Sequence, residues 1–176
     1  MPLRIGLIGA GANTRTQHIP GLLRAPDVVL AGVANRSIES GQRIADEFGI
    51  ARVFDSVEAL LADPGIDAVC IGTWPYKHRE YSVKALEAGK HVLCEARMAM
   101  DLAEAEDMLA ASERNPGLVA QLVPAPFDFK LGPTITRLIE EGALGEIREV
   151  AVNVLNASAL DPAIPLAVAL AVIRIT

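Results

Sequence analysis

The sequence predicts an α/β fold in which a doubly wound parallel sheet is followed by an incomplete second α/β domain. Short, nearly continuous apolar runs alternate with helical patterns between residues 3 and 123. The first apolar run ends in Gly9-Ala10-Gly11, and a helical pattern follows directly. Such alternation is typical of a parallel sheet covered by helices on both faces, and right-handed crossovers then fix the winding of the chain.

The pattern assigns each element of this first domain in turn. Strands are expected at residues 3–9, 28–34, 52–54, 68–71, 91–95 and 118–123, and helices at residues 17–25, 38–48, 57–62, 77–88 and 102–114. Residues suited to helix ends set several of these limits. Asp55 or Ser56 and, further along, Asp101 are suited to N-caps, and Gly89 stops the helix before it.

The regular alternation ends after residue 123. We therefore expect a dinucleotide-binding domain over residues 1–123, and a linker with the truncated start of a further domain over residues 124–176. Residues 124–133 are rich in proline and indicate the linker. A helix is expected at 135–141 and a strand at 146–155. The apolar segment 157–176 is compatible with one further strand, a non-native end, or a segment that needs a partner.

Composition and charge exclude several classes of protein. The chain is 51% apolar and 22% charged, as in globular proteins, and its net charge of −6 argues against general nucleic-acid binding. Cys70 and Cys94 lie in apolar runs and are expected to be buried free thiols. We see no metal-ligand spacing, no apolar stretch suited to a membrane span and no signal peptide, and so expect a cytoplasmic protein without a metal site.

The loop after the first strand has the chemistry of a diphosphate site. Gly9 permits a tight turn, and Gly11 has no Cβ to keep the backbone from a phosphate. The helix that follows offers unpaired N–H groups to an anion, and Ala12 and Asn13, next to the glycines, are further candidate cofactor contacts. Thr14 stands where the third glycine of this fingerprint is usual, and its hydroxyl can cap N–H groups or bond a phosphate oxygen.

The end of the second strand favours NADP over NAD. An acidic residue there would accept hydrogen bonds from the adenosine ribose, but this chain has the neutral Asn35, followed by Arg36 and Ser37. Arginine pairs with a 2′-phosphate in a fork geometry, and serine can donate a further bond. The alternative is that Asn35 and Ser37 cap the next helix, which is compatible with a phosphate contact at Arg36.

Four segments together resemble the Gfo/Idh/MocA family of oxidoreductases. They are the Gly9-x-Gly11 loop with His18-Ile19-Pro20, the stretch from Ile71 to His78, the run Ala88-Gly89-Lys90-His91-Val92-Leu93-Cys94-Glu95, and residues 139–147. The resemblance covers about residues 3–155. It implies a Rossmann domain that binds NAD or NADP, a second domain with an open sheet that carries substrate residues and often the dimer interface, and hydride transfer to or from sugars, polyols or related small molecules.

The resemblance also implies roles for individual residues. Thr73 and Glu95 are expected near the nicotinamide, and Trp74 near the adenosine or the nicotinamide ribose, with packing as the alternative for Trp74. His78 matches a family histidine and is a candidate catalytic residue, cofactor contact or helix-start hydrogen bond. His18, on the first helix, is expected to pack.

One departure from the family pattern bears on the chemistry. The family lysine that assists proton transfer falls on Ala96, and Arg97 is the next candidate catalytic residue, although a guanidinium is a poor general base. The segment 124–127 is apolar where the family is polar, and no histidine follows His91. The sequence therefore leaves open an active oxidoreductase, a catalytically silent module that binds cofactor, and a subunit whose strand at 146–155 joins a partner sheet, as in a homo-oligomer.

Overall fold

The computed structural model describes residues 1–123, 132–156 and 169–175, with the side chains of 1–123 and 132–149. The chain divides into two compact units, Met1–Ala125 and Pro126–Thr176.

The first unit is built on a six-stranded sheet in which every neighbouring pair of strands is parallel. Its strands stand in the order β3-β2-β1-β4-β5-β6. This order reverses direction between β1 and β4, which is where doubly wound sheets bind nucleotides. The strands are β1 (Leu3–Ile8), β2 (Val28–Ala34), β3 (Val53–Phe54), β4 (Ala68–Ile71), β5 (His91–Cys94) and β6 (Ala120–Leu122).

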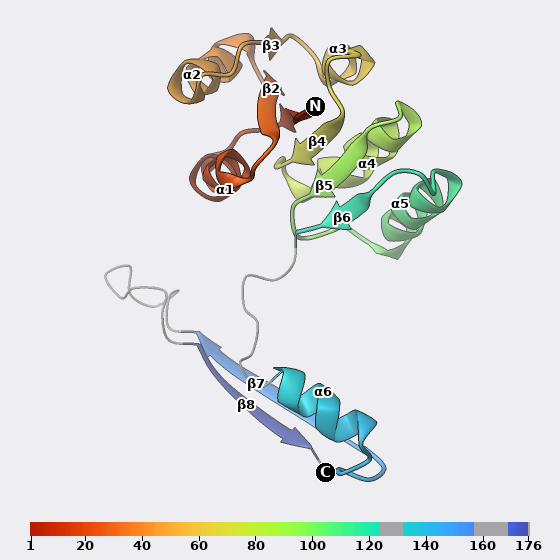
Figure 1. Ribbon diagram of the computed structural model, residues 1–176. Coiled ribbons are helices and arrows are strands. Elements are labelled where there is room, and N and C mark those ends of the chain that lie inside the picture. Colours follow the sequence, from red (N-terminus) through yellow and green to blue (C-terminus); the bar gives the residue numbers. More distant parts are fainter. Residues whose placement is uncertain (124–131, 157–168, 176) are drawn as a thin grey trace. The chain divides into compact units, whose positions relative to one another are not determined.

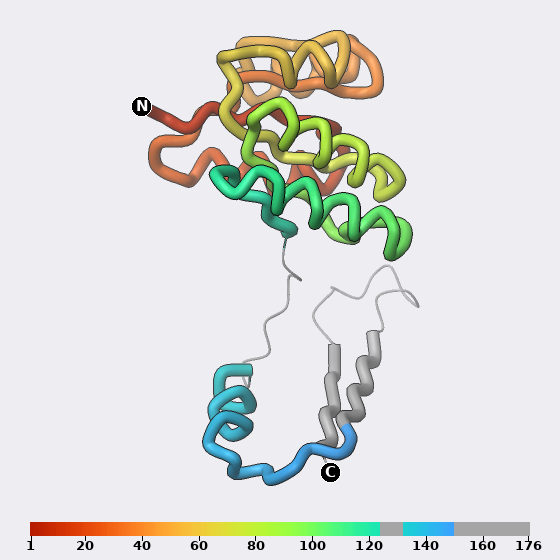
Figure 2. Tube along the Cα trace, turned by 90° about the vertical axis from the view of Figure 1, so that its right-hand side faces the viewer, coloured from red at the N-terminus to blue at the C-terminus, as the bar shows by residue number. Residues whose placement is uncertain are grey.

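Helices cover both faces of this sheet. Figure 1 shows α1 (Ile19–Arg24) and α2 (Ile38–Phe48) on one side, and α3 (Val57–Ala62), α4 (His78–Glu87) and α5 (Leu102–Arg114) on the other. Figure 2 turns the second layer toward the viewer, where α4 and α5 lie side by side and pack against each other. The doubly wound fold predicted from the sequence is therefore confirmed.

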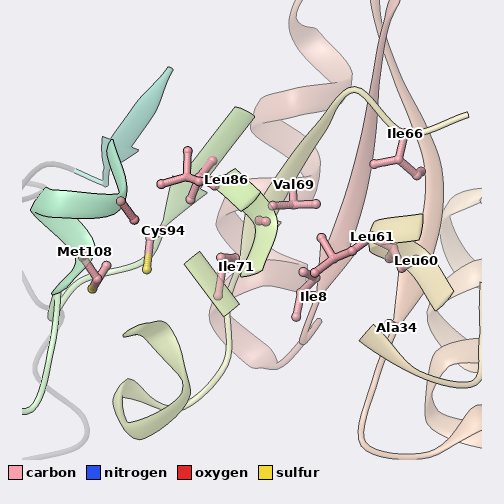
Figure 3. Close-up of a cluster of buried hydrophobic side chains, with 13 residues drawn as sticks. Ile8, Ala34, Leu60, Leu61, Ile66, Val69, Ile71, Leu86, Cys94 and Met108 are labelled. Carbon is pink, nitrogen blue, oxygen red and sulfur yellow. The ribbon is translucent and has the colours of Figure 1, made fainter. Parts of the chain in front are cut away.

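Two buried clusters, one on each face, hold the layers together. Alternation along β1 divides its side chains between them, since Leu7 belongs to the cluster beneath α1 and α2, and Ile8 to the cluster beneath α3, α4 and α5. The latter cluster is drawn in Figure 3 and includes Cys94 and Met108. Cys70 and Cys94 are buried free cysteines, as expected.

Local sequence signals explain why several elements match their predicted limits. Ser37 caps α2 in a reciprocal capping box with Ser40, and Gly49 ends that helix at a φ of 68°. Ser56 caps α3, and Asp101 caps α5 by accepting from the Glu104 N–H at 2.9 Å. The helices expected at residues 38–48, 57–62 and 102–114 have these limits in the structure.

The first and fourth helices differ from expectation at their starts. A π-helical segment, η1 (Thr14–His18), precedes α1, so the helical stretch expected at residues 17–25 begins earlier. Its wider turns depart from the 3.6-residue period that a sequence pattern reveals. A 3₁₀ turn, η2 (Pro75–Lys77), precedes α4 in the same way. Proline at its first positions is compatible with a helix start.

The second unit contains a helix and a two-stranded antiparallel sheet. They are α6 (Gly132–Glu140), β7 (Val150–Asn156) and β8 (Ala169–Ile175), with Val150 opposite Ile175. The linker expected at residues 124–133 extended too far, because Gly132 and Pro133 begin α6, where proline is tolerated. The tail thus contributes one further strand. Residues 124–131, including the apolar segment 124–127, lie outside the described residues.

No helix within the described ranges is both long and apolar enough to cross a bilayer.

Candidate functional site

A pocket of about 720 Å³ opens at the carboxyl end of the first sheet, around the point where the strand order reverses. Its walls come from the loops after β1, β2 and β4 and from the starts of α3 and α4. Of the residues singled out in the sequence, eight line it: Gly9, Gly11, Ala12, Asn13, Asn35, Arg36, Thr73 and Trp74. Thr14, Ser37, His78, Glu95 and Arg97 do not line it.

The glycine loop forms one wall and leaves its backbone accessible. Gly9 has a φ of 80°, and a Cβ there would lie 2.5 Å from Thr73 Cγ2. A Cβ at Gly11 would meet nothing within 4 Å, so this backbone faces open space in the pocket. Because the first N–H groups of a helix have no preceding turn to donate to, the loop fits an anionic diphosphate.

The Thr14 side chain contacts the glycine loop and lies outside the pocket lining. Its side chain is buried, and its Oγ1 donates to the Gly9 carbonyl at 3.1 Å. Gly72, at the end of β4, makes this close packing possible, because a Cβ there would overlap Thr14 Oγ1 and lie 2.8 Å from the Gly9 oxygen. Thr14 thus holds the glycine loop against β4 from beneath.

Asn35 ties the end of β2 to the same loop. Its Oδ1 accepts the Ala10 N–H at 2.7 Å, and its Nδ2 donates to the Ser40 carbonyl at 3.2 Å. Ser37 acts as the N-cap of α2 and is exposed outside the pocket lining. Arg36 is exposed and lines the pocket, and none of the carboxylates in the described part of the chain forms an ion pair with it. Arg36 is thus placed to meet an anion entering here.

Aromatic side chains border the pocket on the side of β4 and α4. Trp74 is 73% exposed and Tyr76 60% exposed, and Tyr81 of α4 lines the same wall. Lys77 lies over the Tyr81 ring, 5.6 Å from its centroid, and pairs with Glu80. Trp74 is therefore not packed in the interior of the first unit. Tyr76, Lys77 and Tyr81 were not singled out in the sequence, because lone aromatic and basic residues at a helix start carry no distinctive pattern.

His78 is fully buried and sits between two backbone carbonyls. Its Nδ1 lies 2.7 Å from the Arg97 oxygen and its Nε2 lies 3.0 Å from the Thr73 oxygen. Both ring nitrogens face carbonyl oxygens, and a neutral imidazole, with one N–H, can donate to only one of them. His78 thus lies between the loop after β4 and the segment after β5, as expected of a helix-start hydrogen bond, and is buried away from the pocket lining.

Glu95 forms a side-chain cluster with Asn13 and His18. Asn13 Nδ2 donates to Glu95 Oε2 at 2.6 Å, and His18 Nε2 makes a short contact with the same oxygen. Burial raises the pKa of Glu95, but hydrogen bonds from His18, the Ala96 N–H and Asn13 outweigh burial and leave this pKa below its ordinary value. His18 therefore contacts a charged partner, and the expectation that it simply packs is wrong.

The two residues after Glu95, Ala96 and Arg97, place no side chain for proton transfer at the pocket wall. Ala96 has only a methyl group where the resemblance implies a lysine, and Arg97 is exposed outside the pocket. Arg97 contacts His78 through its backbone oxygen. Neither candidate catalytic residue, Arg97 or His78, is thus brought to the pocket wall.

Comparison with known proteins assigns the family. A model of the Gfo/Idh/MocA family, described as an oxidoreductase family with an NAD-binding Rossmann fold, matches residues 3–121. The chain belongs to this family. The resemblance expected from the glycine loop and from the run that ends in Glu95 is thereby confirmed.

Relatives of this Gfo/Idh/MocA chain include reductases of sugars. It is 36% identical over 159 residues to 1,5-anhydro-D-fructose reductase from Ensifer adhaerens, covering 90% of this chain and 46% of the relative. It is 32% identical over 155 residues to dTDP-3,4-didehydro-2,6-dideoxy-alpha-D-glucose 3-reductase from Actinomadura kijaniata, covering 86% of this chain and 45% of the relative.

Solved structures agree with this assignment. The crystal structure of KijD10, a 3-ketoreductase from Actinomadura kijaniata in complex with NADP, matches with a TM-score of 0.72 and 29% identity, covering 86% of this chain and 48% of that one. Myo-inositol 2-dehydrogenase from Lactobacillus plantarum shares the fold, with a TM-score of 0.74 and 20% identity, over 89% of this chain and 46% of that one. The chain spans about half the length of the relatives it matches.

Proposed function

We propose that the protein is an NAD(P)-dependent oxidoreductase that transfers hydride to or from a sugar, polyol or related alcohol or carbonyl compound. The observation that carries this proposal is the pocket at the reversal of strand order, where the Gly11 backbone faces open space. Gly9, Gly11, Ala12 and Asn13 would hold the diphosphate. The bound nicotinamide supplies or accepts the hydride. Residues 1–123 would form the cofactor domain, and residues 124–176 the linker and start of the substrate domain.

NADP is the preferred cofactor in this proposal. Arg36 lines the pocket at the end of β2 and is free of ion pairs within the described residues, so its guanidinium is available to a 2′-phosphate. Asn35 stands where an acidic residue would accept hydrogen bonds from the adenosine ribose of NAD. Its side-chain amide already forms hydrogen bonds with the backbone of Ala10 and Ser40. The related 3-ketoreductase KijD10 is in complex with NADP.

Calorimetric titration of the chain with NADPH and NADH tests both statements. Arg36→Ala should weaken NADPH binding about 10- to 100-fold and leave NADH binding nearly unchanged, because hydrogen bonds to charged groups contribute about 1.5–3 kcal/mol. Arg24→Ala, an exposed arginine at the end of α1, is the matched control. An equal loss of affinity for NADPH and NADH in Arg36→Ala would contradict the NADP preference. If neither cofactor bound the wild type, the proposed site would be contradicted.

A catalytically silent protein that binds cofactor is the second candidate. It is favoured by Ala96, since the resemblance implies a lysine there, and by the positions of Arg97 and His78 away from the pocket lining. Steady-state assays of the chain with NADPH or NADP and a panel of sugars, polyols and keto sugars separate the two candidates. Turnover above the uncatalysed rate would eliminate the silent alternative.

We also propose that the protein is cytoplasmic and associates through its second unit. Two buried free thiols suit a reducing compartment. The β7–β8 pair is a two-stranded sheet, which is marginally stable alone in water. Further strands, from a second copy of the chain, would complete such a sheet. A monomeric mass at all concentrations in analytical ultracentrifugation would contradict association.

A further inference from the structure

The cluster of Asn13, His18 and Glu95 connects two elements that are not neighbours in the sheet. Asn13 precedes η1 and His18 is its last residue, and η1 follows β1. Glu95 follows β5, and β4 lies between β1 and β5 in the sheet. The contacts therefore span the carboxyl end of β4. Gly72, at that end, has no Cβ, and η1 comes close enough for the side chains to meet.

Asn13 brings this cluster to the edge of the cofactor pocket. It lines the pocket next to the Gly11 backbone, while its Nδ2 donates to Glu95 Oε2. The side chains of Glu95 and His18 are only 18% and 13% exposed. A carboxylate with so little access to water, one hydrogen bond away from the diphosphate loop, repels an anionic ligand unless a cation compensates its charge.

His18 is the side chain placed to compensate that charge. Its Nε2 contacts the same Glu95 oxygen that accepts from Asn13, and the two nitrogen atoms lie 3.5 Å apart. Protonated imidazole is a cation, and neutral imidazole is not. The charge of the cluster next to the diphosphate loop thus depends on one proton on His18.

Among the side chains that the structure describes, the other ionisable groups around the cluster do not supply this charge. Arg15, on η1, is paired with Glu47 of α2. Burial, followed by the Glu95 charge, raises the pKa of Cys70 on β4 to about 12, and burial raises the pKa of Cys94 on β5 to about 11, so both thiols remain neutral. Arg97, two residues after Glu95, makes no ion pair with it among the described residues.

We propose that His18 is a positioning residue for the cofactor. His18 acts as the counter-ion of Glu95 and makes dinucleotide affinity depend on the protonation of its imidazole. This inference rests on the proposed function, since it assumes that the dinucleotide diphosphate binds at Gly11. Affinity is highest while His18 is protonated. It falls as the pH rises and Glu95 becomes an uncompensated negative charge beside the loop.

The test is a series of calorimetric titrations of the full chain with NADH between pH 6 and pH 9. NADH is the probe because it lacks the 2′-phosphate, whose own ionisation near pH 6 would change the ligand charge. The wild-type dissociation constant should rise roughly three- to tenfold across this range. His18→Gln, which keeps a donor without the charge, should bind as weakly as the wild type at high pH, with no pH dependence.

Further variants separate a counter-ion from a simple structural contact. The double variant His18→Gln/Glu95→Gln should bind tightly with no pH dependence, because no ionisable side chain remains in the cluster. Glu95→Gln alone should bind at least as tightly as the wild type at every pH, because no carboxylate remains to be compensated. His91→Gln, at the opposite end of β5, is the matched histidine control and should keep the wild-type profile. A wild-type profile independent of pH, or weaker binding in Glu95→Gln at every pH, would overturn the counter-ion role. Absence of NADH binding at any pH would overturn the proposed function as well.

Discussion

The side-chain oxygen of Asn35 accepts a hydrogen bond from the Ala10 N–H at 2.7 Å, and this contact joins the end of β2 to the glycine loop after β1. A carboxylate in the same position would read the cofactor ribose in an NAD-binding domain. Here the amide holds the loop in place, while the neighbouring Arg36 faces the pocket. The two adjacent residues therefore differ in role. Asn35 fixes the glycine loop, and the Arg36 side chain is available to contact a ligand in the pocket.

Replacing Asn35 with alanine should weaken the binding of NADPH and of NADH by the same factor. The variant loses one neutral hydrogen bond to the loop, worth about 0.5–1.5 kcal/mol, so we expect roughly 2- to 12-fold weaker binding of NADPH and of NADH. Parallel titrations of the two cofactors check this. An effect confined to NADPH would mean that Asn35 contacts the 2′-phosphate itself and does not act through the loop.

Replacing Gly72 with alanine should destabilise the first unit. The added Cβ would overlap Thr14 Oγ1 and lie 2.8 Å from the Gly9 oxygen, which cannot yield without moving the loop. We expect a loss of about 2 kcal/mol or more in the free energy of unfolding, measured in urea. Gly21→Ala is the matched control, because a Cβ there meets nothing within 4 Å in helix α1, and it should be neutral or stabilising by up to about 1 kcal/mol. Equal stability of the two variants would contradict the packing described.

Stability should depend on pH through Asp67, which pairs with Arg4 at the start of the sheet. Hydrogen bonds from the Arg4 side chain and backbone hold the pKa of Asp67 well below its ordinary value. A lowered folded-state pKa gives stability that is fully present above the unfolded value near 3.9 and is lost as the pH falls toward the folded value.

Asp67→Asn should therefore lower the urea midpoint at pH 7, by a modest amount because the pair is partly exposed. The difference from the wild type should shrink as the pH is taken from 5 to 3, because the Asp67 carboxylate of the unfolded wild type takes up a proton in this range, which favours unfolding. Urea unfolding at pH 7, 5 and 3 checks this. A difference that stays constant or grows toward pH 3 would contradict the role assigned to the pair.

Local sequence signals were sufficient for most of the first unit. The apolar run of β2 and the Ser37 and Gly49 ends of α2 define their elements without help from distant residues, and both were predicted with their observed limits. The start of the helical stretch after Gly11 was not, because π-helical hydrogen bonding leaves no 3.6-residue pattern.

The sequence predicts the site residues that follow the ends of strands. Gly9, Gly11 and Arg36 stand at strand ends, and the fold brings strand ends together, so their place in the pocket follows from the pattern. The contact of His18 with Glu95 joins residues far apart in sequence and depends on how closely η1 approaches β4. No spacing in the chain reveals such a contact, although a histidine and a carboxylate at the same sheet edge are a signal worth testing.

The most direct measurement is a fluorescence titration of the chain with NADPH and, in parallel, NADH. Trp74 is the single tryptophan and lies at the pocket wall, so it should transfer energy to a bound reduced nicotinamide. The proposed site predicts saturable quenching of Trp74 with both cofactors, and tighter binding of NADPH. Failure of either cofactor to bind would contradict the central claim that this pocket is a working dinucleotide site.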